Sequence, residues 1–251
     1  MLRALLASAL LLVSLPLAAM PLRVAVASNF LLPLEAIARA YADQGGASLR
    51  ISAGATGQHY AQIINGAPFD VFLAADQARP QRLLDEGFAL PDSRQTYALG
   101  RLVLWAGADA ELPSSGLGGL VEQMPRRLAI ASPRLAPYGA AAQQALQATG
   151  QWEALRPLIV EGKNISQTLH LLATGNASHA LVAASFTVAA NRPPGEWVLI
   201  DESLYEPIRQ DAVILKSARD PAEAQRFLAF LQGAAAQEIL QRFGYGMVED
   251  G

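Results

Sequence analysis

Short apolar runs alternate along the chain with segments in which apolar residues recur at helical spacing. The runs predict buried strands, and apolar positions three or four residues apart predict helices that pack one face onto those strands. The first pairs are strand 24–27 with helix 30–43, strand 48–52 with helix 57–65, and strand 71–74 with helix 78–86. This alternation is typical of an α/β fold.

The same pattern begins again after residue 97. A strand-like stretch at 102–105 is followed by a segment rich in Ser and Gly, 112–119, which we expect to be an exposed loop. Strands are then predicted at 128–131, 158–160 and 180–183, with helices at 140–148 and 165–173 between them. Because the second block repeats the first, the sequence predicts two Rossmann-like lobes with mostly parallel sheets.

The last part of the chain predicts how the lobes are joined. Strands are expected at 197–200 and 211–215, and helices at 221–232 and 235–243. Strand-like crossings near 97–102 and 208–213 would form two hinges, so we expect lobe 1 at residues 20–98 and 212–251 and lobe 2 at residues 99–211. Ligands of such folds bind beyond the carboxyl ends of strands, which places the expected site in the cleft between the lobes.

The first 19 residues have the pattern of a secretory signal peptide. One basic residue precedes an apolar run over 4–17, and small residues follow at Ala18 and Ala19. The run is too short to span a bilayer comfortably, and no second run approaches that length. We therefore expect an exported, periplasmic protein whose mature part begins near residue 20.

Composition narrows the function further. The 251-residue chain has no cysteine, which excludes disulfides and thiol chemistry, and its formal net charge is −3 with charges of both signs dispersed. The absence of a basic stripe argues against nucleic acid and against an anionic membrane surface as partners. A site for an anion would have to work by local geometry, because the overall charge does not attract one.

Four predicted strands are each followed by a small polar or aromatic group at the opening of a helix. These openings hold Ser28 and Asn29, then Thr56, then Tyr138, and last Ile165 with its neighbours. A helix N-terminus presents unpaired backbone N–H groups and the positive end of the helix dipole. Taken singly, each opening is an ordinary N-cap; if they converge, they can hold a small oxyanion without Lys or Arg.

Other polar residues have simpler interpretations. His59, His170 and His179 are scattered and lack the spacing of a metal site. No G-x-S-x-G turn presents a serine nucleophile, and the glycines of 116–119 are too incomplete for a dinucleotide fingerprint.

Three charged residues near the predicted turns are also candidates for structural roles. Asp70 and Asp76 bracket the strand predicted at 71–74, and they look catalytic when considered alone. We expect them to cap and tie turns, as aspartates at strand ends usually do. Lys163 is expected to be exposed.

Four motifs in this order resemble a known family. They are VAVASNF at 24–30, GATG at 54–57, GAPFDVFLAAD at 66–76 and QEILQRFGY at 237–245. The chain resembles the periplasmic molybdate-binding proteins of ABC transporters, which are type II periplasmic solute-binding proteins, over nearly its whole mature length. The resemblance implies a two-lobed protein without enzymatic activity or cofactor, expected as a monomer, that captures molybdate or tungstate and delivers it to the membrane subunits of an ABC permease.

The resemblance also implies the ligand contacts. Carried over position by position, they are the side chains of Ser28, Asn29, Thr56 and Tyr138 and the backbone N–H of Ile165. These five residues would contact the oxygens of the molybdenum or tungsten oxyanion. In one branch of the family a tyrosine that contacts the ligand stands where this chain has Ala183. The resemblance therefore implies that Tyr138 supplies a tyrosine hydroxyl to the ligand here, from another direction.

The chemistry of these groups fits the implied ligand. Hydroxyl, amide and backbone N–H groups are neutral donors, and a fully ionised tetrahedral oxyanion only accepts hydrogen bonds. Size must then discriminate between anions, so the same fold tuned to sulfate or another tetrahedral oxyanion is the main alternative. A hydrolase or transferase that uses the cleft lacks a positioned base, and a regulatory effector-binding domain is disfavoured by the signal peptide.

Overall fold

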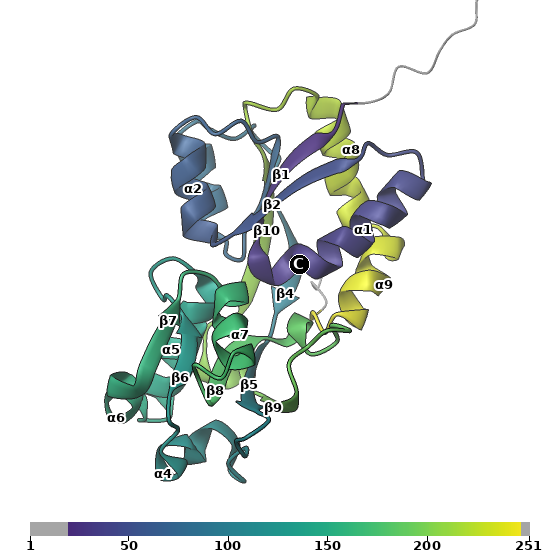
Figure 1. The fold of residues 1–251 in the computed structure, drawn as a ribbon. Coiled ribbons are helices and arrows are strands. Elements are labelled where there is room, and N and C mark those ends of the chain that lie inside the picture. Colours follow the sequence, from purple (N-terminus) through teal and green to yellow (C-terminus); the bar gives the residue numbers. More distant parts are fainter. Residues whose placement is uncertain (1–19, 247–251) are drawn as a thin grey trace, which may run out of the picture.

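The structure, a computed structural model, describes residues 20–246 of the 251-residue chain. The predicted signal peptide at 1–19 lies outside the described residues. Two α/β lobes meet at a narrow waist, with the first and last parts of the chain in one lobe and the middle part in the other (Figure 1). Within the described range, no helix is both long and apolar enough to cross a membrane.

The first lobe is built on a five-stranded sheet in the order β2-β1-β3-β10-β4. The strands are β1 (Leu22–Ala27), β2 (Leu49–Gly54), β3 (Val71–Leu73), β4 (Gln95–Gly100) and β10 (Ile208–Ile214). Strand β1 pairs in parallel with β2 and β3, whereas β10 is antiparallel to both β3 and β4. The sheet is therefore mixed but mostly parallel, as predicted: β1, β2, β3 and β4 run in one direction, and β10, which returns from the other lobe, enters between β3 and β4 in the opposite direction.

Helices cover both faces of this sheet. The helices are α1 (Leu31–Asp43), α2 (Thr56–Ile64), α3 (Ala78–Asp85), α8 (Pro221–Gln232) and α9 (Ala234–Arg242). Val24 and Val26 face the core that contains α1, α8 and α9, while Ala25 between them faces the core beneath α2 and α3. This alternation follows from the two-residue period of a strand, and it buries both faces of β1.

The second lobe has a sheet of the same design in the order β7-β6-β8-β5-β9. Its strands are β5 (Leu102–Gly107), β6 (Leu128–Ala131), β7 (Ile159–Gly162), β8 (His179–Ala183) and β9 (Gly195–Leu199). Its helices are α4 (Leu120–Gln123), α5 (Pro137–Ala148), α6 (Trp152–Leu155) and α7 (Ile165–Ala173). Strand β6 is parallel to β7 and β8, and β5 is antiparallel to β8 and β9, so this sheet is also mixed.

Two local expectations differ from the structure. The segment 112–119 was expected to be an exposed loop, but Gly116–Gly119 forms a short 3-10 helix, and Leu117 is buried where its carbonyl accepts from Gln151 Nε2 at 2.5 Å. Helix α5 begins at Pro137, three residues before the expected start at 140. Proline suits the first turn of a helix, because the N–H that it lacks has no partner there.

The lobes are connected where β4 and β10 run side by side. Strand β4 ends at Gly100 and β5 of the second lobe begins at Leu102, while Ile208 at the start of β10 pairs with Gly100. Both connecting strands belong to the sheet of the first lobe. The boundaries expected at 98/99 and 211/212 fall within these two strands.

A buried carboxylate ties together the edge of the first lobe that lies away from the waist. Asp70, just before β3, is almost fully buried and accepts from Arg23 through the backbone N–H at 2.7 Å, Nε at 3.0 Å and Nη2 at 2.7 Å. The backbone N–H of Arg219 adds a bond at 3.0 Å. Burial by itself raises the pKa of Asp70, but the hydrogen bonds from both arginines outweigh it and lower the pKa to about 2.

We expect Asp70→Asn to destabilise the protein by about 3 kcal/mol at neutral pH, because two arginines lose the carboxylate that satisfies them. The folded pKa lies below the ordinary 3.8, so the contribution of Asp70 is present above about pH 4 and is lost as the pH falls towards 2. Denaturant unfolding should therefore show the parent and variant converging between these pH values. The exposed Asp109, changed to Asn, is the control and should alter stability by less than about 0.5 kcal/mol.

Candidate functional site

A small cavity lies where the two lobes meet at the waist. Its volume is about 190 Å³, part of which is open to solvent. Its walls come from the carboxyl ends of β1 and β2, from a residue just after β3, and from the helical segments that follow β1, β2, β6 and β7. The lining residues are Ala27, Ser28, Asn29, Gly54, Ala55, Thr56, Ala75, Ala136, Pro137, Tyr138 and Ile165.

All five residues expected to contact a ligand line this cavity. Ser28 and Asn29 begin the 3-10 turn Ser28–Phe30 between β1 and α1, and Thr56 is the first residue of α2. Tyr138 is the second residue of α5, and Ile165 is the first residue of α7. The first three come from one lobe and the last two from the other, so the cavity has donors on both sides only while the lobes are together.

Hydrogen bonds cross the cleft beside the cavity and hold the lobes in contact. The N–H of Gly57 donates to Leu135 O at 2.9 Å, and the N–H of Ser166 donates to Ser28 Oγ at 3.4 Å. Ser185 Oγ, in the 3-10 turn Ala184–Phe186, donates to Asn29 O at 2.8 Å. The residues expected to bind a ligand thus also take part in closing the cleft.

Three hydroxyls at the cavity each accept a hydrogen bond from the protein. Thr56 Oγ1 accepts from the N–H of Ala75 at 3.1 Å, and Tyr138 Oη accepts from Gln210 Nε2 at 3.3 Å. Ser28 Oγ accepts the longer bond from Ser166. A hydroxyl has one proton and two lone pairs, so each of these groups can still donate its proton to a molecule in the cavity.

The side-chain amide of Asn29, by contrast, has no N–H group left to donate to a molecule in the cavity. Its Nδ2 donates to Gln210 Oε1 at 2.9 Å and to Tyr245 Oη at 3.0 Å. Both N–H groups of this side chain therefore donate to other residues of the protein. The sequence analysis had expected them to contact the ligand. Asn29 lines the cavity, but in this arrangement its amide orders the groups behind it.

Four residues that the sequence analysis did not single out form hydrogen bonds with residues that line the cavity: Gln210, Ser166, Ser185 and Tyr245. Gln210 lies on β10 between Arg209 and Asp211 and is fully buried. A buried glutamine needs specific partners for its amide, because an unpaired buried amide is costly, but this polar stretch of sequence does not show that Gln210 is buried. The residues that it contacts are too far away in the sequence to be found from spacing.

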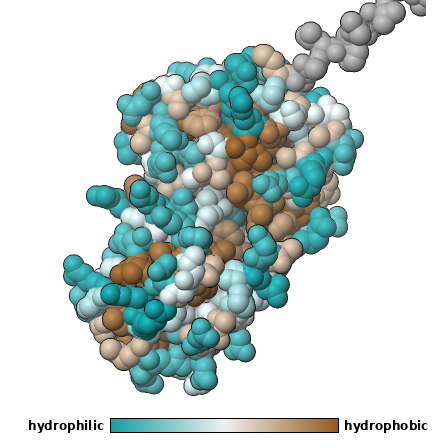
Figure 2. All heavy atoms as spheres, in the orientation of Figure 1, coloured by the Kyte–Doolittle hydropathy of each residue, from teal (hydrophilic) through white to brown (hydrophobic). Residues whose placement is uncertain are grey.

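The cavity is uncharged. None of the residues that line it is acidic or basic. Burial raises the pKa of Tyr138 and of Tyr97 well above the ordinary value, and raises the pKa of Tyr245 to about 12, so these phenols stay protonated at neutral pH. Hydrophilic side chains gather instead on the outer parts of both lobes, and the surface at the waist is paler and more apolar (Figure 2).

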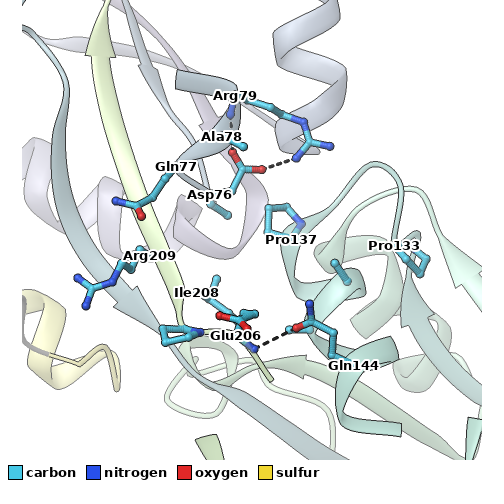
Figure 3. A pocket seen from close by; sticks show the side chains of 14 residues that line it. Asp76, Gln77, Ala78, Arg79, Pro133, Pro137, Gln144, Glu206, Ile208 and Arg209 are labelled. Carbon is cyan, nitrogen blue, oxygen red and sulfur yellow. Dashed lines mark hydrogen bonds and ion pairs between the residues drawn. The ribbon is translucent and has the colours of Figure 1, made fainter. Parts of the chain in front are cut away.

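A larger pocket opens on the side of the waist near the hinge strands. It contains about 720 Å³ of empty space and is open to solvent. Asp76, Arg79, Glu206 and Arg209 lie around it, and Asp76 forms an ion pair with Arg79 (Figure 3). The two carboxylates there are balanced by the two arginines, so the pocket offers no net positive charge, and the small uncharged cavity at the helix openings is the better candidate for an anion.

The other isolated polar residues do not form a second centre. Among residues 20–246, no three His, Cys, Asp or Glu residues are grouped as metal ligands. His59 is buried beside Phe69 and Phe72, its Nε2 has no hydrogen-bond partner, and burial lowers its pKa. Lys163 is exposed and does not line the cavity.

Glycines make room for the tyrosine that reaches the cavity. A Cβ on Gly100 would overlap the Tyr138 hydroxyl and lie 2.7 Å from Gln210 Nε2. A Cβ on Gly139 would overlap the carbonyl oxygen of Ala131, so glycine lets α5 approach β6 closely. Ala183, at the end of β8, is not among the lining residues.

Comparisons with known proteins agree with this architecture. Residues 22–246 match the model of a family described as bacterial extracellular solute-binding protein. The chain is 41% identical over 232 residues to molybdate-binding protein ModA of Rhodobacter capsulatus, covering 92% of this chain and 90% of that protein. It is 43% identical over 227 residues to ModA of Azotobacter vinelandii, covering 90% and 89%.

A solved structure is also similar over most of the chain. The Azotobacter vinelandii periplasmic molybdate-binding protein superposes with a TM-score of 0.85 at 38% identity, and the match covers 91% of this chain and 100% of that one. The two-lobed arrangement with its interlobe cleft is thus the fold of a solved binding protein.

We expect Gly100→Ala to destabilise the protein by about 1 to 3 kcal/mol, because the added methyl group must displace the Tyr138 hydroxyl or the Gln210 amide. Gly118→Ala is the matched control, since no heavy atom lies within 4 Å of a Cβ at that position. Denaturant unfolding of both variants measures the difference. Equal stabilities would show that the space beside Tyr138 is not restricted.

Proposed function

We propose that this protein captures molybdate in the cavity between its two lobes. The premise is that the chain belongs to the family of bacterial extracellular solute-binding proteins. It is a binding protein rather than an enzyme, and it serves as the periplasmic component of an ABC transporter. Tungstate, which has nearly the same size and shape, is proposed as a second ligand. The closed protein would then release the oxyanion to the membrane permease.

The observation that carries this proposal is the set of neutral donors around an uncharged cavity. Ser28, Thr56 and Tyr138 each accept from the protein and keep a proton for the ligand. An oxyanion that carries no proton can accept from all of them, together with the N–H of Ile165 at the start of α7. We propose these residues as the ligand contacts, with Asn29 as a lining residue whose amide supports the others.

The strength of such a site is sufficient for a transport protein. Hydrogen bonds to a charged group contribute about 1.5 to 3 kcal/mol each, and a micromolar complex requires about −8 kcal/mol. A small number of these bonds meets that requirement after the cost of ordering the ligand and closing the lobes is subtracted. No positive side chain is needed, which agrees with the neutral lining.

We expect Thr56→Val to weaken molybdate binding about five- to 150-fold, because valine has the shape of threonine but no hydroxyl proton to donate. Thr149→Val removes the same group from the end of α5, where its hydroxyl donates to Ala145 O at 2.9 Å and not to the cavity. Calorimetric titration of both variants should show a loss of affinity only in the first. Unchanged affinity of Thr56→Val would remove Thr56 from the site.

We expect molybdate and tungstate to raise the melting temperature and to reduce the radius of gyration in small-angle scattering, because ligand favours the closed form in which both lobes contribute donors. Sulfate at equal concentration should do so much less, since the smaller ion reaches fewer donors at once. A shift with sulfate as large as that with molybdate would contradict the proposed ligand and favour a sulfate-binding protein of the same fold.

A further inference from the structure

We propose that Gln210 is a positioning residue that fixes the direction of the Tyr138 hydroxyl proton, and that it thereby restricts the cavity to oxyanions without a proton. The inference rests on the proposed function, because it concerns selectivity within the same cavity. Gln210 does not line the cavity itself. It acts through Tyr138, which lines the cavity and whose hydroxyl accepts from the Gln210 amide.

Gln210 occupies a place where both ends of its amide must be satisfied. It is completely buried on β10, at an irregularity in the pairing with β4 between Gln210 and Asp211. The oxygen and the nitrogen of a glutamine amide have opposite hydrogen-bonding roles, so the neighbours decide which end points where. A buried amide with a donor facing a donor would be strongly destabilised.

The orientation follows from the count of protons on the neighbouring groups. Tyr245 Oη donates its one proton to Asn29 O at 3.0 Å, so it must accept from Asn29 Nδ2. The same Nδ2 donates to Gln210 at 2.9 Å, which requires the oxygen of Gln210 at that end. Tyr97 Oη also lies within hydrogen-bonding distance of this oxygen, at 3.2 Å.

The nitrogen of Gln210 is therefore left to face Tyr138. Its N–H donates to Tyr138 Oη at 3.3 Å. Because that oxygen already accepts from Gln210, the proton of Tyr138 is left for another acceptor. Tyr245 Oη lies close to it, but a charged ligand oxygen in the cavity that Tyr138 lines would be the stronger acceptor. Gly100 supplies the space for this contact, since a side chain there would meet both groups.

The consequence is selectivity by protonation. A deprotonated oxyanion such as molybdate, tungstate or sulfate offers only lone pairs, and it satisfies a donor from Tyr138. Hydrogenphosphate and hydrogenarsenate carry an O–H group at neutral pH. In the cavity this O–H group would either face a donor of the protein or leave that donor without an acceptor, and both weaken binding. Size then separates molybdate from sulfate, and the direction fixed by Gln210 separates both from phosphate.

Gln210→Glu tests this direction with almost no change of shape. The introduced carboxyl keeps an oxygen towards Asn29 and Tyr97, and replaces the donor that faces Tyr138. The groups around it are the phenols of Tyr97, Tyr138 and Tyr245 and the amide of Asn29, while the adjacent Asp211 is paired with Arg94. Burial without a cation raises the pKa of a carboxyl, so this group should titrate near neutral pH.

The expected result is an affinity that depends on pH only in the variant. At about pH 9 the ionised carboxyl takes the Tyr138 proton away from the cavity, and molybdate binding should be at least about tenfold weaker than in the parent. At about pH 6.5 the protonated carboxyl donates to Tyr138 as the amide does, and affinity should return towards that of the parent. Calorimetric titration at both pH values measures this, with the parent nearly constant.

Two further variants separate positioning from packing. In a Tyr138→Phe background, Gln210→Glu should add no change in selectivity towards phosphate, because the hydroxyl whose direction it alters is gone. Gln151→Glu makes the same substitution at a buried glutamine outside the cavity, whose Nε2 donates to Leu117 O, and it should leave affinity unaffected at either pH. If Gln210→Glu does not fold, Gln210→Met should lower the ratio of molybdate to phosphate affinity about tenfold.

Several outcomes would overturn the inference. Parent-like affinity of Gln210→Glu at both pH values would show that the donor facing Tyr138 is not needed. A molybdate-to-phosphate ratio unchanged in Gln210→Met, or altered equally with and without the Tyr138 hydroxyl, would assign Gln210 to packing alone. A parent that binds molybdate and phosphate equally would overturn this inference but not the proposed function, whereas a parent that binds no oxyanion would overturn both.

Discussion

The structure depends on a single constraint, which is that each hydroxyl at the cavity has one proton to give. A doubly charged oxyanion surrounded by neutral groups is bound stably only if each of its oxygens accepts a hydrogen bond. A hydroxyl that donates its proton to another group of the protein therefore cannot stabilise the ligand. Thr56 and Tyr138 each receive a hydrogen bond from behind, from the Ala75 N–H and the Gln210 amide. The groups behind the cavity therefore decide what the cavity can hold.

This constraint also links the cavity to the motion of the lobes. Gln210 lies on β10, and Gly100 lies at the end of β4, and these are the two strands that run from one lobe to the other. Tyr138 belongs to the second lobe and meets both of them. Bending at the crossing would then change the distance between Gln210 and Tyr138, so that the donor is positioned for a ligand when the lobes are closed.

The sequence predicted much of this architecture because strands and helix openings have local patterns. The two-lobed fold and the positions of Ser28, Thr56, Tyr138 and Ile165 at strand-to-helix turns follow from periodicity, and the family resemblance adds which residue of each turn is expected to contact the ligand. The antiparallel entry of β10 could not be predicted, since it depends on pairing between strands more than a hundred residues apart. The direction of the Asn29 amide was missed for the same reason, because Gln210 and Tyr245 are distant in sequence.

The carboxylate next to Gln210 in the chain is neutralised by an ion pair. Asp211 follows Gln210 directly, and an unpaired carboxylate so near the cavity would oppose any anion. Instead Asp211, itself buried in the first lobe, accepts from the partly exposed Arg94 through Nε at 2.5 Å and from Thr96 Oγ1 at 2.7 Å. The paired charge is nearly neutral at a distance, so the anion meets dipoles whose directions are fixed rather than net charge. The proposed site would therefore select its ligand by shape and by proton count, which a cluster of lysines or arginines would not do.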